Sequence, residues 1–130
     1  MQKYLEGPKP NLGIARRDMP QIRSFNREEF LAGLDARYEN VTITAAELSP
    51  TQLEIHENIV AKMHTSADVS TKPIMFSNDW YILDGHHRWA MSLMMGQPAA
   101  PLNAIWIDLP IYKLIAAARR FAKVEYATEL

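Results

Sequence analysis

The sequence predicts an α+β fold, in which a small mixed sheet is flanked by helices and preceded by an extended N-terminal arm. Short apolar runs with strand character alternate along the chain with longer stretches whose apolar residues recur at helical spacing. The predicted order of elements is helix, strand, helix, hairpin, helix, strand, helix. With 130 residues, 48% of them hydrophobic, the chain is long enough for one domain with a buried core.

Residues 1–24 are predicted to form the arm, and residues 25–130 the folded domain. Prolines and glycines among mixed charges favour an extended chain that has no packed core of its own. Arg16, Arg17 and Arg23 are candidates for contacts with DNA or nucleotide phosphate, or for docking the arm on a second copy of the chain or on virion proteins. Solvated side chains are the commoner outcome in a terminal segment.

The first half of the domain holds two predicted helices with a strand between them. A helix is predicted over 26–34 and a β-branched strand over 40–44. The second helix is predicted over 49–63, because Ser49 can cap it, Pro50 suits its first position, and apolar residues follow at helical spacing.

The second half begins with a hairpin, predicted from two apolar runs at 74–76 and 80–83 that flank a turn. A helix is expected over 86–95, then a strand over 102–109 and a last helix that begins near Pro110. The apolar face of the helix after the hairpin is expected in the core, through Trp89, Ala90, Leu93 and Met94.

The composition excludes several classes of protein. The chain has no cysteine, so disulfide scaffolds, thiolate zinc sites and cysteine nucleophiles are excluded. Fourteen basic residues against 15 acidic ones give no broad electrostatic attraction to duplex DNA, although a local basic patch remains compatible with that sum. No signal peptide or membrane span is evident, so the expected location is the cytoplasm and no membrane partner is expected.

The junction Asp84-Gly85-His86-His87-Arg88 lies between the hairpin and the helix after it. A glycine there allows a sharp turn, and the first amides of the helix then face outward at the positive end of its dipole. Arg88 adds a planar cation that suits phosphate, and Asp84 can orient an imidazole, hold a metal or accept a proton. The cluster therefore predicts a phosphate-binding site.

A purely structural interpretation stands beside this one. Asp84 is a good helix N-cap, and Arg88 can be a solvated surface cation. Zinc is a minor alternative, because adjacent histidines on a helix point about 100° apart and do not easily share one metal ion. No metal ligand set is therefore assigned.

The string PIMFSNDWYILDGHHRWAM resembles the core of the ParB/sulfiredoxin-like superfamily, in which a hairpin leads into a phosphate-binding turn and a helix. The resemblance covers about residues 41–122, and Pro50 and Gln52 match the turn that enters an earlier helix of the family. Two departures matter. His86 stands where sulfiredoxins carry their cysteine, and the chain lacks the G-E-R-R turn and the helix-turn-helix of chromosome-partitioning ParB proteins.

The D-G-H-H-R string is more similar to that of free serine kinases in this superfamily. The resemblance implies a nucleotide as ligand (ATP, ADP or CTP) with Mg²⁺, and binding by Gly85, His86, His87, Arg88, Gln52 and Lys72. It implies catalytic roles for Glu54, Asp84, His87 and Arg88, with Glu54 as the base that activates an acceptor hydroxyl and Glu57 as its alternative. The expected function is nucleotide-dependent phosphotransfer or hydrolysis.

The chain also resembles small ParB-like proteins of tailed bacteriophages, which implies a phage origin and a location in the host cytoplasm or the virion. Two other functions stay open. One is a non-catalytic binding or assembly module in a virion or nucleoprotein complex, with the arm in contact with DNA, a second copy or virion proteins. The other is a metal-dependent nuclease that uses Asp84, His86, His87 and Glu57.

Overall fold

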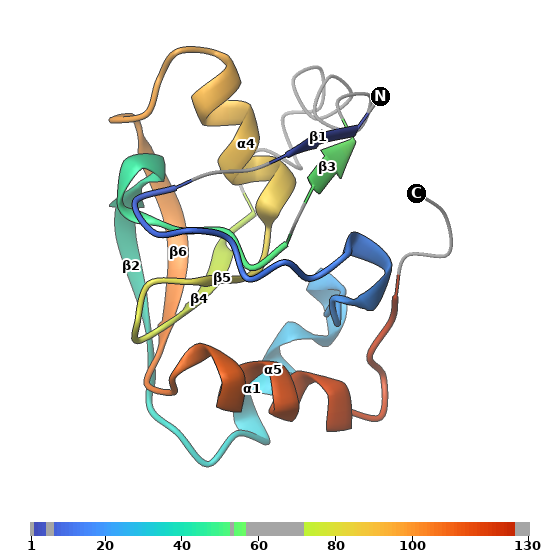
Figure 1. Cartoon of the computed structure of the whole chain (residues 1–130). Coiled ribbons are helices and arrows are strands. Elements are labelled where there is room, and N and C mark those ends of the chain that lie inside the picture. Colours follow the sequence, from blue (N-terminus) through green and yellow to red (C-terminus); the bar gives the residue numbers. More distant parts are fainter. Residues whose placement is uncertain (1, 5–6, 53, 57–71, 127–130) are drawn as a thin grey trace.

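The computed structural model describes residues 2–4, 7–52, 54–56 and 72–126 (Figure 1). The main sheet has four strands, which are β2 (Tyr38–Thr44), β6 (Pro101–Ile107), β4 (Ile74–Ser77) and β5 (Ile82–Asp84), in that order. β2 is antiparallel to β6, β6 is parallel to β4, and β4 is antiparallel to β5. The predicted mixed sheet and α+β class are therefore confirmed.

Helices cover both faces of this sheet. In Figure 1, α4 (His86–Met94) lies on one side of it, and α1 (Arg27–Ala32) and α5 (Ile111–Arg120) lie on the other. Three short 3₁₀ helices add to these, at Arg16–Asp18, Ser24–Asn26 and Ala45–Glu47. A separate ribbon pairs β1 (Gln2–Tyr4) with β3 (Glu54–His56).

The strands divide their side chains between two hydrophobic clusters, as alternation along a strand requires. In β4, Ile74 and Phe76 pack into the cluster around Trp89 of α4. Met75 of β4 and Leu83 of β5 pack into the second cluster, with α1 and α5. Both faces of the sheet are thus buried, and the end of β5 is fixed between two packed layers.

Most predicted elements are confirmed, among them the hairpin, the helix after it, the last strand and the last helix. The helix predicted over 49–63 is wrong where the chain is described, because 54–56 form β3 instead. Ser49 pairs with Tyr81 in a parallel bridge, and its hydroxyl accepts the amide of Lys9 instead of capping a helix. Residues 53 and 57–63 lie outside the described residues.

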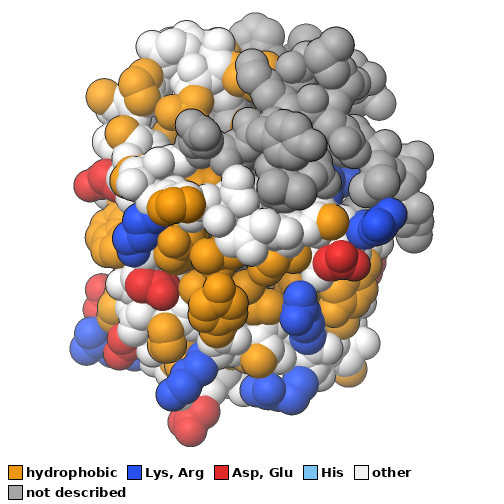
Figure 2. Space-filling model, viewed as in Figure 1, with side chains coloured by type: hydrophobic (Ala, Val, Ile, Leu, Met, Phe, Trp, Pro, Cys, Tyr) orange, Lys and Arg blue, Asp and Glu red, His pale blue; other side chains and the backbone are white. Residues whose placement is uncertain are grey.

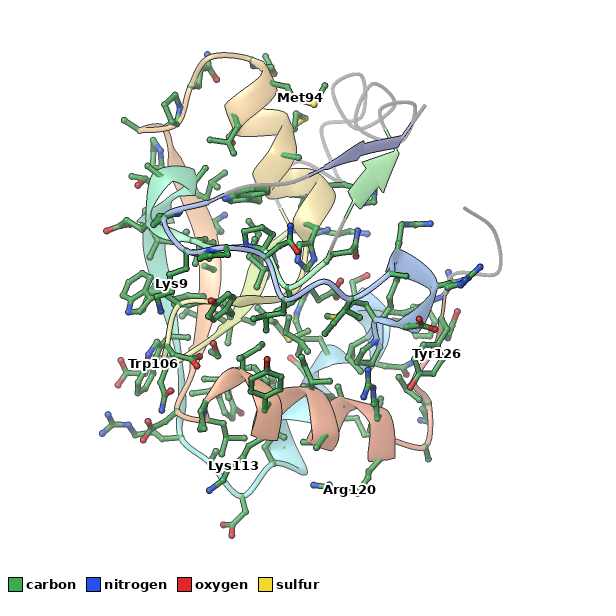
Figure 3. All side chains as sticks on the ribbon, viewed as in Figure 1. Lys9, Met94, Trp106, Lys113, Arg120 and Tyr126 are labelled. Carbon is green, nitrogen blue, oxygen red and sulfur yellow. The ribbon has the colours of Figure 1, made fainter. Side chains whose placement is uncertain are left out.

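The predicted core face of α4 needs one correction. Trp89 and Ala90 are buried and Leu93 is packed against them, but Met94 is 45% exposed, and Figure 3 places it at the far end of the helix. Ser92 is buried instead.

The N-terminal segment crosses the domain and packs on it. Met19 and Ile22 are buried in the cluster that contains α5. Gln21 and Glu125 exchange both backbone hydrogen bonds, at 2.8 and 3.0 Å. In Figure 2 the middle of this face is hydrophobic, with Lys and Arg side chains around it. We call residues 16–27 the strap, because they join the C-terminal segment to the end of β5.

Candidate functional site

The turn between β5 and α4 requires a glycine. Gly85 has φ +108°, a backbone conformation that L side chains rarely adopt. A Cβ atom there would lie 2.9 Å from Nη2 of Arg88 and 3.0 Å from Cγ1 of Ile74. The glycine thus permits both the sharp turn and the position of the guanidinium directly above it.

The first amides of α4 take no part in the hydrogen bonds within the helix. The amide of Trp89 donates to the carbonyl of Gly85 at 3.1 Å, which closes the first helical turn. The amides of His86, His87 and Arg88 precede that bond, and helix geometry gives them no acceptor within the helix. They lie at the positive end of the helix dipole.

The His86 side chain has a structural position. It is buried, and its Nε2 atom accepts the amides of Thr51 and Gln52 at 3.1 and 3.2 Å. Since Nε2 is the acceptor, the proton of the neutral ring lies on Nδ1. Burial, followed by the nearby charges of His87 and Arg88, lowers the pKa of His86 to about 3. The ring therefore pins residues 51–52 to the turn, and only the backbone amide of His86 is left for a phosphate.

Asp84 joins the turn to the strap. Its carboxylate accepts the amides of Gly85 and Ile22. Burial raises the pKa of Asp84, while the positive charges of Arg88 and Arg27 and these two amides act in the opposite direction. The residue before α4 that takes the N-cap position is Gly85, with no side-chain capping bond. Asp84 is thus placed as a link between segments and not as a helix cap.

The Arg88 guanidinium is held at one end only. Its Nη2 donates to the carbonyl of Pro73 at 3.0 Å. Its Nε is buried and has no hydrogen-bond partner among the described residues. Burial lowers the pKa of Arg88, and the charge of Asp84 counteracts part of that effect. Arg88 is half-buried at the edge of a cavity, and a cation in such a position attracts anions.

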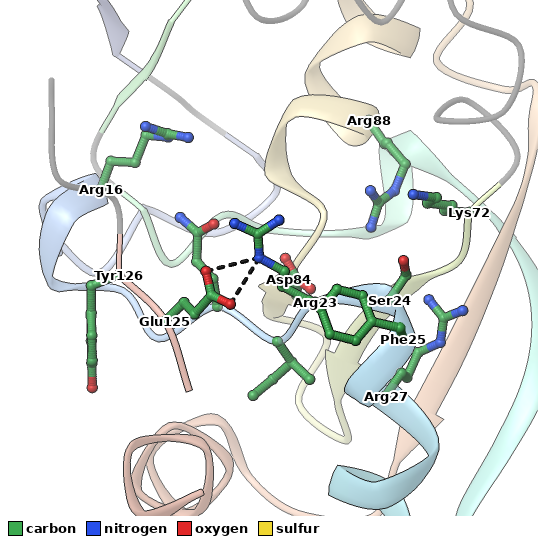
Figure 4. A pocket seen from close by; sticks show the side chains of 12 residues that line it. Arg16, Arg23, Ser24, Phe25, Arg27, Lys72, Asp84, Arg88, Glu125 and Tyr126 are labelled. Atoms are coloured by element: carbon green, nitrogen blue, oxygen red, sulfur yellow. Dashed lines mark hydrogen bonds and ion pairs between the residues drawn. The ribbon is translucent and has the colours of Figure 1, made fainter. Parts of the chain in front are cut away.

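Two hollows meet at this turn. The larger is a cleft of about 700 Å³ between the strap, the turn, Lys72 and the C-terminal segment (Figure 4). The smaller, of about 170 Å³, lies beside the first turn of α4. Four residues line both: Arg16, Gln21, Asp84 and Arg88. The guanidinium of Arg88 thus borders the open space that a ligand would occupy.

The cleft is strongly cationic. Five of its lining side chains are basic, namely Arg16, Arg23, Arg27, Lys72 and Arg88. The two acidic ones are Asp84 and Glu125, and Glu125 is paired with Arg23, whose Nε donates to both carboxylate oxygens at 2.8 Å. The whole chain has a net charge of −1, so the positive potential is local to this cleft.

The structure brings most of the predicted site residues together. Lys72, Asp84 and Arg88 line the cleft, and Gln52, Gly85, His86 and His87 line the smaller hollow. Glu54 is in β3, and its side chain lies outside the described part of the chain, as does Glu57. The catalytic role of Glu54 therefore stays a prediction.

Sequence reasoning missed Phe25 and Arg27, and it placed Arg16 and Arg23 on an arm outside the domain. All four line the cleft. A usable signal was present, because basic residues recur between 16 and 27 beside an apolar Met19 and Ile22, which marks a segment that packs while its cations stay near solvent.

The described residues contain no group of three His, Asp or Glu side chains that could hold a metal ion. The nuclease alternative needs Glu57, which is not among them. Within the same described residues, no helix is long and apolar enough to cross a membrane.

No family model and no solved structure matches the chain. An uncharacterized protein of Methanocaldococcus jannaschii is 33% identical in an alignment of 82 positions, which covers 58% of this chain and 31% of that protein. The chain thus spans about a third of the length of this relative. The name of the relative states no activity, so the function is argued from the cleft itself.

Proposed function

We propose that the cleft binds the phosphate chain of a nucleotide, such as ATP, ADP or CTP, as a ParB/sulfiredoxin-like domain would. One observation carries the proposal: five basic side chains, Arg88 of α4 among them, line one open cleft of about 700 Å³, and the rest of the first turn of α4 lines the adjoining hollow. Backbone amides at a helix start and an Arg fork are the donors that phosphate oxygens suit best. The volume is within the range of small-molecule sites.

The surroundings of Arg88 give it the central role. Its side chain lines both the cleft and the adjoining hollow, so the guanidinium is placed to pair with a phosphate group there. Gly85, which has no side chain, lets this guanidinium lie close to the backbone of the turn. The structural interpretation of Arg88 as a solvated cation does not fit its burial or its bond to Pro73.

The same arrangement supports phosphotransfer or hydrolysis as the chemistry. In that case Arg88 would stabilise the charge that develops on the transferred phosphoryl group, and Asp84 would be the residue to hold Mg²⁺, which would neutralise phosphate charge, or to position the attacking hydroxyl or water. Glu54 is the base that the resemblance implies. Association with a virion and a phage origin also stay predictions from the resemblance.

Calorimetric titration with tripolyphosphate, ATP, ADP and CTP, with and without Mg²⁺, tests the binding. We expect the Arg88→Ala variant to lose affinity for all of them by about 10- to 100-fold, as the loss of a charge-assisted bond predicts. Arg27→Ala is a second test, because it leaves the contact of Arg88 with Pro73 in place. Lys113→Ala is the control, since Figure 3 shows Lys113 on the outer side of α5, away from the cleft.

Phosphate release from bound nucleotide then tests turnover, with Glu54→Gln as the variant that removes the expected base. Binding without turnover would favour the non-catalytic module. If none of the four ligands binds the wild-type protein, or if Lys113→Ala weakens binding as much as Arg88→Ala, the proposal is wrong.

A further inference from the structure

Phe25 is a large hydrophobic side chain that lies in the cleft and not in the core. Its side chain is 77% exposed, which is the highest value among the large hydrophobic residues described. It lies on the 3₁₀ helix Ser24–Asn26 of the strap and lines the cleft with the basic residues (Figure 4). The hydrophobic core does not use this ring.

The backbone on either side of Phe25 is anchored. Asn26 is buried, and its amide donates to the carbonyl of Arg23 at 2.9 Å. On the other side Ile22 is buried in the core, and its amide donates to Asp84. The backbone on both sides of Phe25 is therefore anchored, so the ring is presented to the cleft from a packed support.

The ring is surrounded by charges that suit a phosphorylated aromatic ligand. Arg23 and Arg27, two positions away on either side in sequence, line the same cleft, as does Lys72. An exposed aromatic face gains most from a flat, apolar partner such as a nucleobase, and the cations bind the phosphates attached to it. Neither group alone would distinguish a nucleotide from a simple anion.

We propose that Phe25 stacks on the base of the nucleotide whose phosphate chain lies at Arg88. This rests on the proposed function and adds the residue that recognises the base. A mononucleotide fits better than a single strand of nucleic acid, because a strand needs aromatic rings repeated along a groove. The other aromatic residue of the cleft, Tyr126, lies apart from Phe25 with Arg23 and Glu125 between them in Figure 4.

The test compares tripolyphosphate with ATP and CTP in calorimetric titrations of the wild-type protein, Phe25→Ala and Phe25→Trp. Tripolyphosphate has no base, so it reports on the phosphate site alone. We expect ATP and CTP to bind the wild-type protein more tightly than tripolyphosphate. We expect Phe25→Ala to lower the affinity for ATP and CTP by about 5- to 100-fold and to leave the affinity for tripolyphosphate unchanged. Phe25→Trp is expected to keep the nucleotide affinity of the wild-type protein.

Tyr112→Ala is the matched control, because Tyr112 is also an exposed aromatic, at 69%, and does not line the cleft. Phe25 is so exposed that its removal is expected to leave the melting temperature unchanged. The stacking role is overturned if Phe25→Ala leaves the nucleotide affinity intact, or if it lowers the affinity for tripolyphosphate as much as the affinity for nucleotides. A short single-stranded oligonucleotide that binds more tightly than ATP would overturn the choice of ligand. If tripolyphosphate itself fails to bind, the phosphate site is wrong and this proposal with it.

Discussion

At the scale of single residues, both the backbone turn and the position of Arg88 depend on the absence of a Cβ atom at Gly85. An alanine there must adopt φ +108° and push against Arg88 and Ile74. We expect Gly85→Ala to destabilise the fold by about 1–3 kcal/mol in urea titrations, because strain of this kind has that magnitude. We also expect Gly85→Ala to displace the guanidinium of Arg88 and so to lower the affinity for tripolyphosphate.

Gly33→Ala is the matched control for that substitution. Gly33 has φ −83°, and a Cβ atom there would meet its nearest neighbour at 3.5 Å, an ordinary contact. The stability of the Gly33→Ala variant is therefore expected to equal that of the wild-type protein or exceed it slightly. Equal losses in the two variants would contradict the argument from Gly85.

His86 gives the fold a dependence on pH. Its pKa is about 3 in the folded protein against 6.5 when it is unfolded, so the unfolded chain binds the proton first as the pH falls. The stabilising contribution is complete above pH 6.5 and is lost progressively toward pH 3. We expect the free energy of unfolding to fall by about 2 kcal/mol between pH 7 and 5 from this residue alone.

The measurement is the free energy of unfolding against pH for the wild-type protein and for His86→Gln, which keeps an acceptor and cannot take up a proton in this range. The raised pKa of Asp84 gives a term of opposite sign at pH values above 3.8, and this term is common to both proteins. The difference between the two curves therefore isolates His86. Parallel curves would show that burial does not keep the imidazole neutral in the folded protein.

At the scale of elements, the strap and the C-terminal segment form the outer wall of the cleft and are joined by the Arg23–Glu125 ion pair. Glu125 satisfies a cation that an incoming phosphate would otherwise use. We expect Glu125→Gln to raise the affinity for tripolyphosphate by up to about fivefold, the range of an exposed ion pair. The effect should shrink as salt is added.

Glu29→Gln is the control for the charge change. Glu29 is bonded to Lys123 in an equally exposed ion pair at 2.6 Å, and neither residue lines the cleft. Both substitutions change the net charge of the protein by the same amount. Equal gains in affinity from both would mean that only the overall charge matters and that Glu125 does not compete for Arg23.

At the scale of the whole molecule, the sequence predicted the parts whose pattern is local. The hairpin, α4, β6 and α5 carry apolar periodicity and turn residues within a few positions of each other, so they were predictable. The segment 49–56 was not, because its geometry comes from distant partners, among them His86 and the carbonyl of Ile82, which accepts the hydroxyl of Thr51. Tertiary hydrogen bonds there overrode a helical pattern.

The site was predictable to the same degree. The turn at 84–88 was recognisable, since glycine and its polar neighbours are contiguous in sequence. The other wall of the cleft comes from the strap and from Glu125, and these meet the turn only through the fold. Met19 and Ile22, which are buried, indicate that the strap packs, but they do not indicate which part of the domain it contacts.

A cleft made of segments so distant in sequence exists only in the folded chain, so a ligand that binds it must stabilise the whole molecule. At a concentration 100 times its dissociation constant, tripolyphosphate is expected to add about 2.7 kcal/mol to the free energy of unfolding. The melting temperature of a domain this size should then rise by roughly 10 °C. Thermal unfolding with increasing ligand measures the rise, and Arg88→Ala should remove most of it at the same concentration. A rise that persists in Arg88→Ala, or that sulfate at equal ionic strength reproduces in full, would mean that the anion acts elsewhere on the surface.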